Sequence, residues 1–376
     1  LNVFLLSYYK YTDWFIKNFN LIFKTNFPLP HIALPIGISF FTFQLIAYLV
    51  DSHRGLTLNY KFVDYLLFIT FFPQLIVGPI VHHAEMVPQF EDTKNLAVNW
   101  ENVAKGLFVF SIGMAKKILL ADPLTANAQS FFEEPAQIVS ALCAWYYSIE
   151  YTISYYFDLS AYADMAIGVG LLFNIVIPEN FDSPYKARNF KEYWQRWHIT
   201  LSRFLGAYIF RSVYKKESNW RNYYFATMIT FLVSGFWHGA GWHFIFWGLV
   251  NGALVCVASW MKRKGYSMNA VASHSLTLIG IVLARIMFVC GFKQMLLVFK
   301  SLVNFSSMDI ALGHGITYIK IIQLAVSCVI IFALPTTKKL ADNIRFNKKS
   351  FAALAAASAL SIAFMGRASV FLYFQF

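Results

Sequence analysis

Two histidines, His238 and His243, lie in an apolar and aromatic segment that reads FWHGAGWHFIFWG over residues 236–248. An ionisable side chain at membrane depth costs on the order of a few kcal/mol, so such a residue is by default a candidate for a functional site. Imidazole accepts protons near neutral pH, and an apolar environment favours the neutral form that acts as a base. The segment therefore predicts general-base chemistry in a hydrophobic setting.

The composition predicts an all-α polytopic membrane protein. Of the 376 residues, 58% are hydrophobic and only 13% are charged, whereas soluble domains carry about 25% charged residues. The formal net charge of +12 could indicate nucleic-acid binding, but the basic residues cluster in short gaps between apolar runs. That distribution fits the positive-inside rule, so we expect a multi-pass protein in contact with the lipid bilayer and with no nucleic acid.

Nine apolar segments are candidates for transmembrane helices, because a bilayer requires about 20 mostly apolar residues. They are residues 31–50, 103–120, 137–157, 161–178, 223–237, 243–260, 275–292, 318–334 and 351–371. We expect them to form one membrane-embedded domain over residues 1–376 with roughly nine crossings. The chain begins inside an apolar run at Leu1, so we also expect further helices to precede it.

A further apolar stretch, residues 62–81, contains the sequence FFPQLIVGPIV. Pro73, Gly78 and Pro79 would interrupt a helix there, and such breaks are tolerated only where protein or a water-filled cavity satisfies the freed backbone groups. The stretch predicts a kinked or re-entrant element. Gln74 could bind substrate there or satisfy a freed carbonyl, and we expect His82 and His83, after the break, to be solvated.

The basic residues predict the orientation of the chain. Residues 182–221 contain nine bases and three acids, which is typical of a cytoplasmic segment. Two predicted crossings separate this segment from the basic cluster at 262–264, and two more separate that cluster from the one at 338–349. All three clusters would therefore lie on the same side of the membrane. The tight turn at 239–242 then lies away from the cytoplasm, next to His238.

Within the basic segment, residues 191–214 show apolar side chains at helical spacing with arginines among them. This pattern predicts one amphipathic helix at the inner membrane interface. Trp197 would face the apolar side, whereas Arg196 would face headgroups or an anionic ligand. His198 follows directly and lies close to the apolar face.

Other polar residues in apolar segments have structural interpretations. Asp158 and Asp164 are six residues apart and do not share one helical face, so we expect each to cap a broken helix or to pair with a base such as Arg188 or Arg196. His243 begins a returning helix, where end-capping or packing outweighs catalysis. Lys116 and Lys117, at the end of a predicted span, are expected to extend to the headgroups.

The histidine motifs RWHITLSRFL, which contains His198, and SGFWHGAGWHFIFWG, which contains His238, occur with five other segments. These segments are LPIGISFFTFQLIAYLVD (34–51), FFPQLIVGPIV (71–81), YFDLSAYADMAIG (156–168), NFDSPY (180–185) and FLYFQF (371–376). The combination resembles the membrane-bound O-acyltransferase family. It is most similar to the bacterial branch that includes the alginate O-acetylation protein, its peptidoglycan O-acetylating relatives and the D-alanine exporter of teichoic acid.

The resemblance implies a ring of transmembrane helices around a central funnel, with re-entrant and interfacial helices. It implies His238 as the catalytic base and His198 as a second catalytic residue on the donor side. From the residues alone, His238 could instead hydrogen-bond a broken helix end, and His198 could be an interfacial histidine. Trp237, beside the base, joins the candidates for substrate binding or support. Relatives often carry an Arg-Asp pair where this chain has Gly206-Ala207, which puts docking of a carrier or substrate in doubt.

The resemblance also implies an acetyltransferase of the cell (inner) membrane that passes an acetyl group from a cytoplasmic donor toward an extracytoplasmic polysaccharide. Acetyl-CoA is the expected donor, no cofactor is expected to stay bound, and a periplasmic or extracellular partner acyltransferase would complete the transfer. No HExxH or GxSxG motif occurs, so we expect no metal and no acyl-serine. The alternatives are D-alanyl transfer to teichoic acid, a membrane transporter and a non-catalytic scaffold.

Overall fold

The computed structural model describes residues 1–57, 60–76, 78–133, 138–215, 219–306, 316–344 and 347–367. These residues are predominantly helical and include no β-strand, so the predicted all-α fold is confirmed. The first helices are α1 (Asn2–Phe23), α2 (Ile38–His53), α3 (Phe62–Thr70), α4 (His83–Glu91), α5 (Trp100–Ala115), α6 (Asp122–Glu133), α7 (Ala141–Leu172), α8 (Phe190–Arg196) and α9 (Ile199–Leu205). The later helices are α10 (Arg211–Val213), α11 (Trp220–His238), α12 (Trp242–Arg263), α13 (Ala270–Val289), α14 (Phe292–Leu302), α15 (Tyr318–Ala333), α16 (Thr337–Asn343) and α17 (Lys348–Phe364). Short helical turns connect them: η1 (Phe72–Gln74), η2 (Thr93–Leu96), η3 (Lys116–Ala121), η4 (Pro184–Lys186), η5 (Gly206–Phe210) and η7 (Met365–Arg367).

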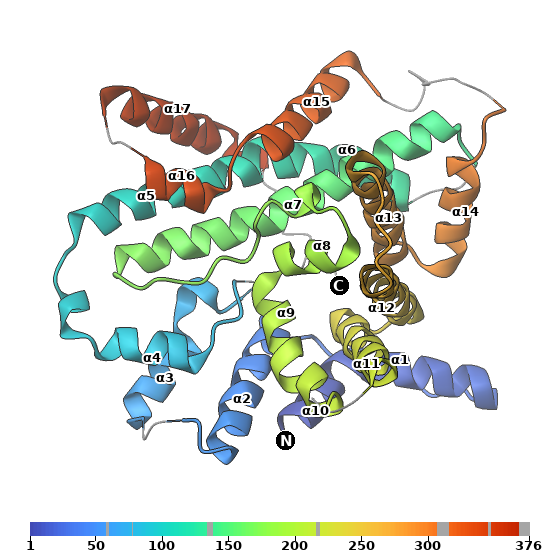
Figure 1. Ribbon diagram of the computed structural model, residues 1–376, viewed down its shortest axis with the longest axis horizontal. Coiled ribbons are helices and arrows are strands. Elements are labelled where there is room, and N and C mark those ends of the chain that lie inside the picture. Colours follow the sequence, from blue (N-terminus) through green and yellow to red (C-terminus); the bar gives the residue numbers. More distant parts are fainter. Residues whose placement is uncertain are drawn as a thin grey trace.

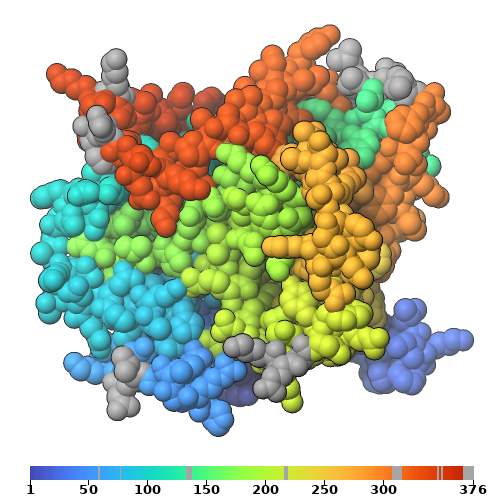
Figure 2. Space-filling model, viewed as in Figure 1, coloured from blue at the N-terminus to red at the C-terminus, as the bar shows by residue number. Residues whose placement is uncertain are grey.

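Helix α7 runs through the centre of the molecule (Figure 1). Every residue from Glu150 to Ala161 is buried, which is typical of a core helix and not of a helix with one polar face. Helices α5, α6, α13 and α14 pack against it, and α16 and α17 pack against α5. Segments α15–α17 therefore form one edge of the molecule, coloured orange to red in Figure 2.

The prediction of two separate spans over residues 137–157 and 161–178 is wrong, because one unbroken helix, α7, runs from Ala141 to Leu172 across the expected gap. The polar residues near Asp158 suggested an interruption. In the structure, that carboxylate is neutralised by Lys117, so the helix has no reason to end there.

Two described helices, α12 and α13, are long and apolar enough to cross a membrane. Helices α15 and α16 together pass the same test, although they are bent by 59° at the break between them. The larger number of crossings expected from the sequence stays a prediction. The terminal segment 371–376 of the family resemblance lies outside the described residues.

The predicted interruption after α3 is confirmed. Helix α3 ends at Thr70, the short turn η1 follows, and α4 begins only at His83. The backbone amide of Ile80 donates to the hydroxyl of Thr200 at 2.9 Å, which ties the non-helical segment to α9. Protein groups thus satisfy freed backbone atoms in the broken element, as its sequence requires.

The single amphipathic helix predicted over residues 191–214 is instead divided into α8, α9, η5 and α10. The division occurs at Trp197 and His198, where the chain forms an isolated antiparallel bridge between Phe181 and Trp197. The amide of Ile199 donates to the carbonyl of Asn180 at 2.9 Å. These long-range backbone bonds replace the helical hydrogen bonds that a continuous helix would make.

Close packing of α11 against α12 positions the segment that contains His238. A Cβ atom on Gly235 would lie 2.3 Å from the carbonyl oxygen of Phe244 and 3.2 Å from the Cα of Gly248. The two helices can therefore approach this closely only because both facing positions are glycine. This close approach holds α12 against α11 and so positions the turn that connects them.

The three basic clusters lie near one another in space. Lys339 forms an ion pair with Asp182 at 2.7 Å, and Lys191 and Lys262 line one groove between α8, α12 and α13. Helix α11 then leads away from this side over 19 residues, or about 28 Å at 1.5 Å per residue. This arrangement agrees with a common side for the clusters, and the orientation of the chain in the membrane stays a prediction.

The substitution Gly235→Ala is expected to lower the thermal unfolding midpoint of the purified protein, because overpacking costs ~1–3 kcal/mol. Gly206→Ala is the matched control, since a Cβ there meets no atom within 4 Å. Its midpoint should stay the same or rise. Equal midpoints for the two variants would contradict the close contact between α11 and α12.

Candidate active site

His198 and His238 line one small internal cavity, although they are forty positions apart in the sequence. The cavity measures about 20 Å³, which is room for roughly one water molecule. Its other lining residues are Tyr155, Leu159, Tyr193, Trp194, Trp197, Trp247, Asn251, Ile281, Ala284, Arg285 and Phe288. The two histidines selected from the sequence therefore share one site, with an arginine that was not selected.

His198 is buried and has a left-handed backbone conformation, with φ 47° and ψ 53° at the start of α9. A non-glycine residue with positive φ is uncommon, and strained residues of this kind cluster at functional sites. Asn180 holds Thr200, two residues after His198, because its side-chain oxygen accepts from both the amide and the hydroxyl of Thr200. The break between α8 and α9 places the side chain of His198 in the interior of the protein, and its position relative to the membrane interface stays a prediction.

His238 is the last residue of α11 and is also buried. The rings of Trp237, Trp247 and Phe288 surround its imidazole, with centroids 4.9, 5.1 and 5.2 Å away. Among the described residues, the Nδ1 atoms of both His198 and His238 have no hydrogen-bond partner. Each imidazole thus retains a nitrogen that can exchange a proton with a ligand.

Helix α1 holds the end of α11 in place. The Lys10 ammonium donates to the carbonyls of Trp237 and His238 at 2.6 and 3.0 Å, and the hydroxyl of Tyr11 donates to the carbonyl of Phe236. The last carbonyls of a helix lack intrahelical partners, and a cation there also interacts favourably with the helix dipole. No local sequence pattern predicts this contact, because more than two hundred residues separate the partners.

Arg285 of α13 is the cationic group of the cavity, and sequence reasoning missed it. Its guanidinium carbon lies 3.7 Å from the ring centroid of Tyr155 and 5.2 Å from that of Trp197. The side chain is buried, and its Nε has no hydrogen-bond partner in the described part of the chain. A charged residue inside a predicted span is itself a signal for function, so the sequence did contain the evidence.

The predicted supporting residues divide between the cavity and the surrounding structure. Trp197 lines the cavity, whereas Trp237 packs against α2, where its ring stacks on Phe43 and its indole donates to the carbonyl of Ser39. Gln74 is buried in the broken element and its amide donates to the carbonyl of Phe68 at 3.4 Å. Gln74 and Trp237 are therefore outside the cavity lining, in structural positions.

Arg196 also lies outside the cavity and pairs with Glu192 at 3.0 Å and with Asp182 at 3.4 Å. His243 packs its ring against Phe244, with centroids 4.1 Å apart, and does not line the cavity. The packing role predicted for His243 agrees with this contact.

The ion pairs of Arg196 connect α8 to Asp182 and so stabilise the segment before His198.

The carboxylates of Asp158 and Asp164 in α7 each pair with a base, as predicted, but the bases are lysines and not Arg188 or Arg196. Asp158 contacts Lys117 and Asp164 contacts Lys116, each at 2.6 Å. The predicted extension of Lys116 and Lys117 to the headgroups is therefore also wrong. Lys117 additionally pairs with Asp122 at 2.7 Å, so that one buried ammonium connects η3, α6 and α7.

Comparisons with known proteins agree with this geometry. A model of the membrane-bound O-acyltransferase family matches residues 54–301, a range that contains both cavity histidines. The chain belongs to the membrane-bound O-acyltransferase family. The family predicted from the motifs is thereby confirmed, and acyl transfer is its reaction class.

Individual relatives of this O-acyltransferase differ in substrate. A peptidoglycan O-acetyltransferase of Helicobacter pylori is 39% identical over the whole of this chain and 81% of its own length. A probable alginate O-acetylase of Pseudomonas aeruginosa is 36% identical over 67% of this chain. A teichoic acid D-alanyltransferase of Streptococcus thermophilus is 27% identical over 61% of this chain and 58% of its own length. The chain spans about half the length of the alginate relative, at 48%.

Removal of the Lys117 ammonium should destabilise the protein strongly. Lys117→Met leaves the carboxylates of Asp122 and Asp158 buried without this partner, and breaking a buried ion pair in this way costs ~3–5 kcal/mol. We expect a much lower yield of folded protein and a lower thermal midpoint in detergent. Lys105→Met is the matched control, because Lys105 pairs with the exposed Glu101 and such pairs contribute ~1 kcal/mol at most. Equal yields and equal thermal midpoints for the two variants would show that the ion pairs of Lys117 do not stabilise the fold.

Proposed function

We propose that this chain is an integral-membrane O-acetyltransferase of the cell (inner) membrane. It takes an acetyl group from a cytoplasmic thioester, acetyl-CoA, and transfers it toward an extracytoplasmic glycan. The observation that carries the proposal is the shared cavity, which contains His198, His238 and Arg285 within one aromatic enclosure. Family membership supplies the reaction class, and the cavity contains the groups that the reaction requires.

The reaction needs a base, a group that stabilises negative charge and exclusion of water. The acceptor oxygen bonds to the acetyl carbonyl carbon while its proton passes to an imidazole nitrogen of His238. The C–S bond of the thioester then breaks, and the thiolate leaves. The guanidinium of Arg285 stabilises the oxyanion that forms on the carbonyl oxygen, and His198 provides a second imidazole for the intermediate or the leaving thiolate.

The proposed acceptor is peptidoglycan. Support comes from the H. pylori relative, whose similarity extends over the whole of this chain, whereas the alginate relative matches 67% of it. An alginate-like exopolysaccharide is the second candidate. As the family resemblance implies, a separate periplasmic or extracellular acyltransferase receives the acetyl group and completes the transfer to the glycan.

The competing functions make different demands on the cavity. D-alanyl transfer is supported by relatives of lower identity, at 27%. A transporter would need a path for its substrate, whereas the cavity has room for roughly one water molecule. A non-catalytic scaffold would tolerate changes at His198 and His238.

His238→Ala should abolish acetyl transfer while leaving the amount of protein in the membrane unchanged. Loss of a general base reduces the rate ~10²–10⁴-fold, which is measured as acetate released by mild alkali from the glycan of a complemented deletion strain. His243→Ala, five residues away and outside the cavity, is the control and should retain acetylation. Normal acetylation with His238→Ala would refute the catalytic assignment.

Arg285→Met is expected to lower kcat ~10²–10³-fold with a smaller change in KM, because the lost interaction forms mainly in the transition state. Labelled acetyl-CoA and membrane vesicles provide the assay, and Arg285→Lys should recover part of the rate. The control is Arg203→Met, which removes an exposed pair with Glu85. An unchanged kcat for Arg285→Met would exclude the oxyanion role.

A further inference from the structure

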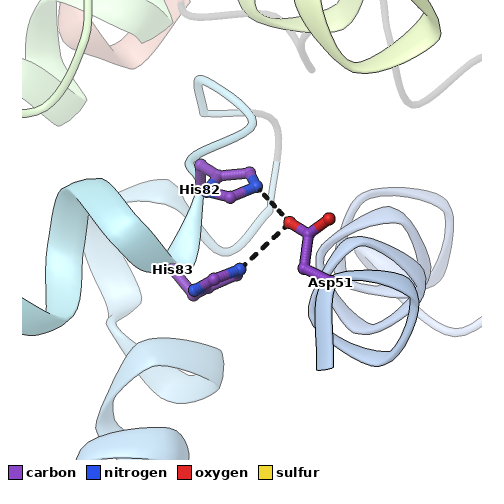
Figure 3. A group of neighbouring side chains, drawn as sticks. All are labelled: Asp51, His82 and His83. Atoms are coloured by element: carbon purple, nitrogen blue, oxygen red, sulfur yellow. Dashed lines mark hydrogen bonds and ion pairs between the residues drawn. The ribbon is translucent and has the colours of Figure 1, made fainter. Parts of the chain in front are cut away.

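A second cluster of chemically active side chains lies outside the histidine cavity. Asp51, at the end of α2, faces His82 and His83, which precede and begin α4 (Figure 3). The Nε2 atoms of His82 and His83 lie 2.7 and 3.1 Å from Oδ2 of Asp51. The hydroxyl of Tyr208 in η5 donates to the same oxygen at 2.6 Å and lies 2.8 Å from Nε2 of His82.

The cluster corrects the sequence prediction for the paired histidines. His83 is buried, with only 1% of its side chain exposed, and the side chain of Asp51 is 6% exposed. His82 is partly exposed, at 32%. The cluster of Asp51, His82 and His83 is therefore mostly buried within the protein, and solvent reaches it through His82.

The ligand atoms are arranged as a divalent metal ion requires. One atom each from Asp51, His82 and His83 lies within 4.8 Å of the others. Zinc ligands at about 2.0–2.1 Å in a tetrahedron lie ~3.3 Å from each other. The observed separations of 2.7 and 3.1 Å from the imidazole nitrogens to the carboxylate oxygen need to widen by only ~0.2–0.6 Å to admit such an ion.

The surrounding groups also fit a metal site. A metal-bound histidine usually donates its second ring N–H to an acceptor, and the hydroxyl oxygen of Tyr60, 3.1 Å from Nδ1 of His83, can accept that bond. Nδ1 of His82 accepts from the amide of Ala84 at a long 3.3 Å. Binding a metal at Nε2 moves the ring proton of His82 to Nδ1, and solvent can replace this weak bond because the contact is exposed.

We propose that Asp51, His82 and His83 bind a divalent transition-metal ion of the zinc type. Two imidazoles and a carboxylate are N and O ligands that suit this class of cation, and water can take the fourth position. The ion fastens α2 to α4, and the hydrogen bond from the hydroxyl of Tyr208 to Asp51 ties η5 to the site. Since none of the four residues lines the cavity of His198 and His238, the site is structural and separate from acyl transfer.

The test measures metal content, so it is independent of the acyl-transfer assays. The full chain is purified in detergent on an affinity tag without histidine, stripped with a chelator and dialysed against Zn²⁺. Inductively coupled plasma mass spectrometry should find about one zinc per chain. Zinc should also raise the thermal midpoint, because an ion that binds only the folded state stabilises it. A zinc-free protein whose midpoint does not change overturns the proposal.

Variants locate the ion. His82→Gln and His83→Gln should each lose the bound zinc, and the partial exposure of His82 makes its variant the one expected to fold normally. His274→Gln is the control and should retain zinc, because His274 lies elsewhere, 3.0 Å from the carbonyl of Ala187. Full zinc retention by the folded His82→Gln protein would overturn the assignment. If His83→Gln does not fold, the His82 variant and the wild-type titration decide.

Discussion

The ion pair between Lys117 and Asp158 allows the central helix to be buried on every face. Two charges in a low-dielectric interior are stable only when they are paired in close geometry, and the 2.6 Å contact provides this. The ammonium also holds Asp122, so α6 and α7 meet at one cation. With its carboxylate neutralised, α7 continues as one helix for 32 residues, and the other elements pack around it.

The cavity lined by His198 and His238 is built from this central helix outward. Tyr155 and Leu159 project from α7 into the cavity lining, and the ring of Tyr155 stacks on that of Trp197. Trp197 directly follows the last residue of α8, so the stack fixes the break that turns His198 inward. The same tyrosine ring carries the guanidinium of Arg285. One buried aromatic side chain thus positions both a histidine and the cation.

The sequence was sufficient for the fold class, the family and the two histidines, because composition and local motifs carry that information. It was insufficient wherever a long-range contact decided the local structure. The break at His198 depends on backbone bonds from residues 180–182, which helical periodicity cannot reveal. The continuity of α7 depends on a lysine forty-one positions away. Arg285 is different, since a charge within an apolar span was visible in the sequence and was overlooked.

The small size of the cavity bears on how acyl transfer avoids hydrolysis. A thioester in contact with water and a general base would lose its acetyl group to water, so the site must admit an acceptor hydroxyl while excluding bulk solvent. A space for roughly one water molecule, lined by Trp197, Trp247 and Phe288, meets this requirement. The acetyl group and the acceptor can enter only if lining side chains or helices move. Because α1 fastens the end of α11 through Lys10, the backbone of His238 is held in place, and adjustment of the cavity falls to its other lining residues.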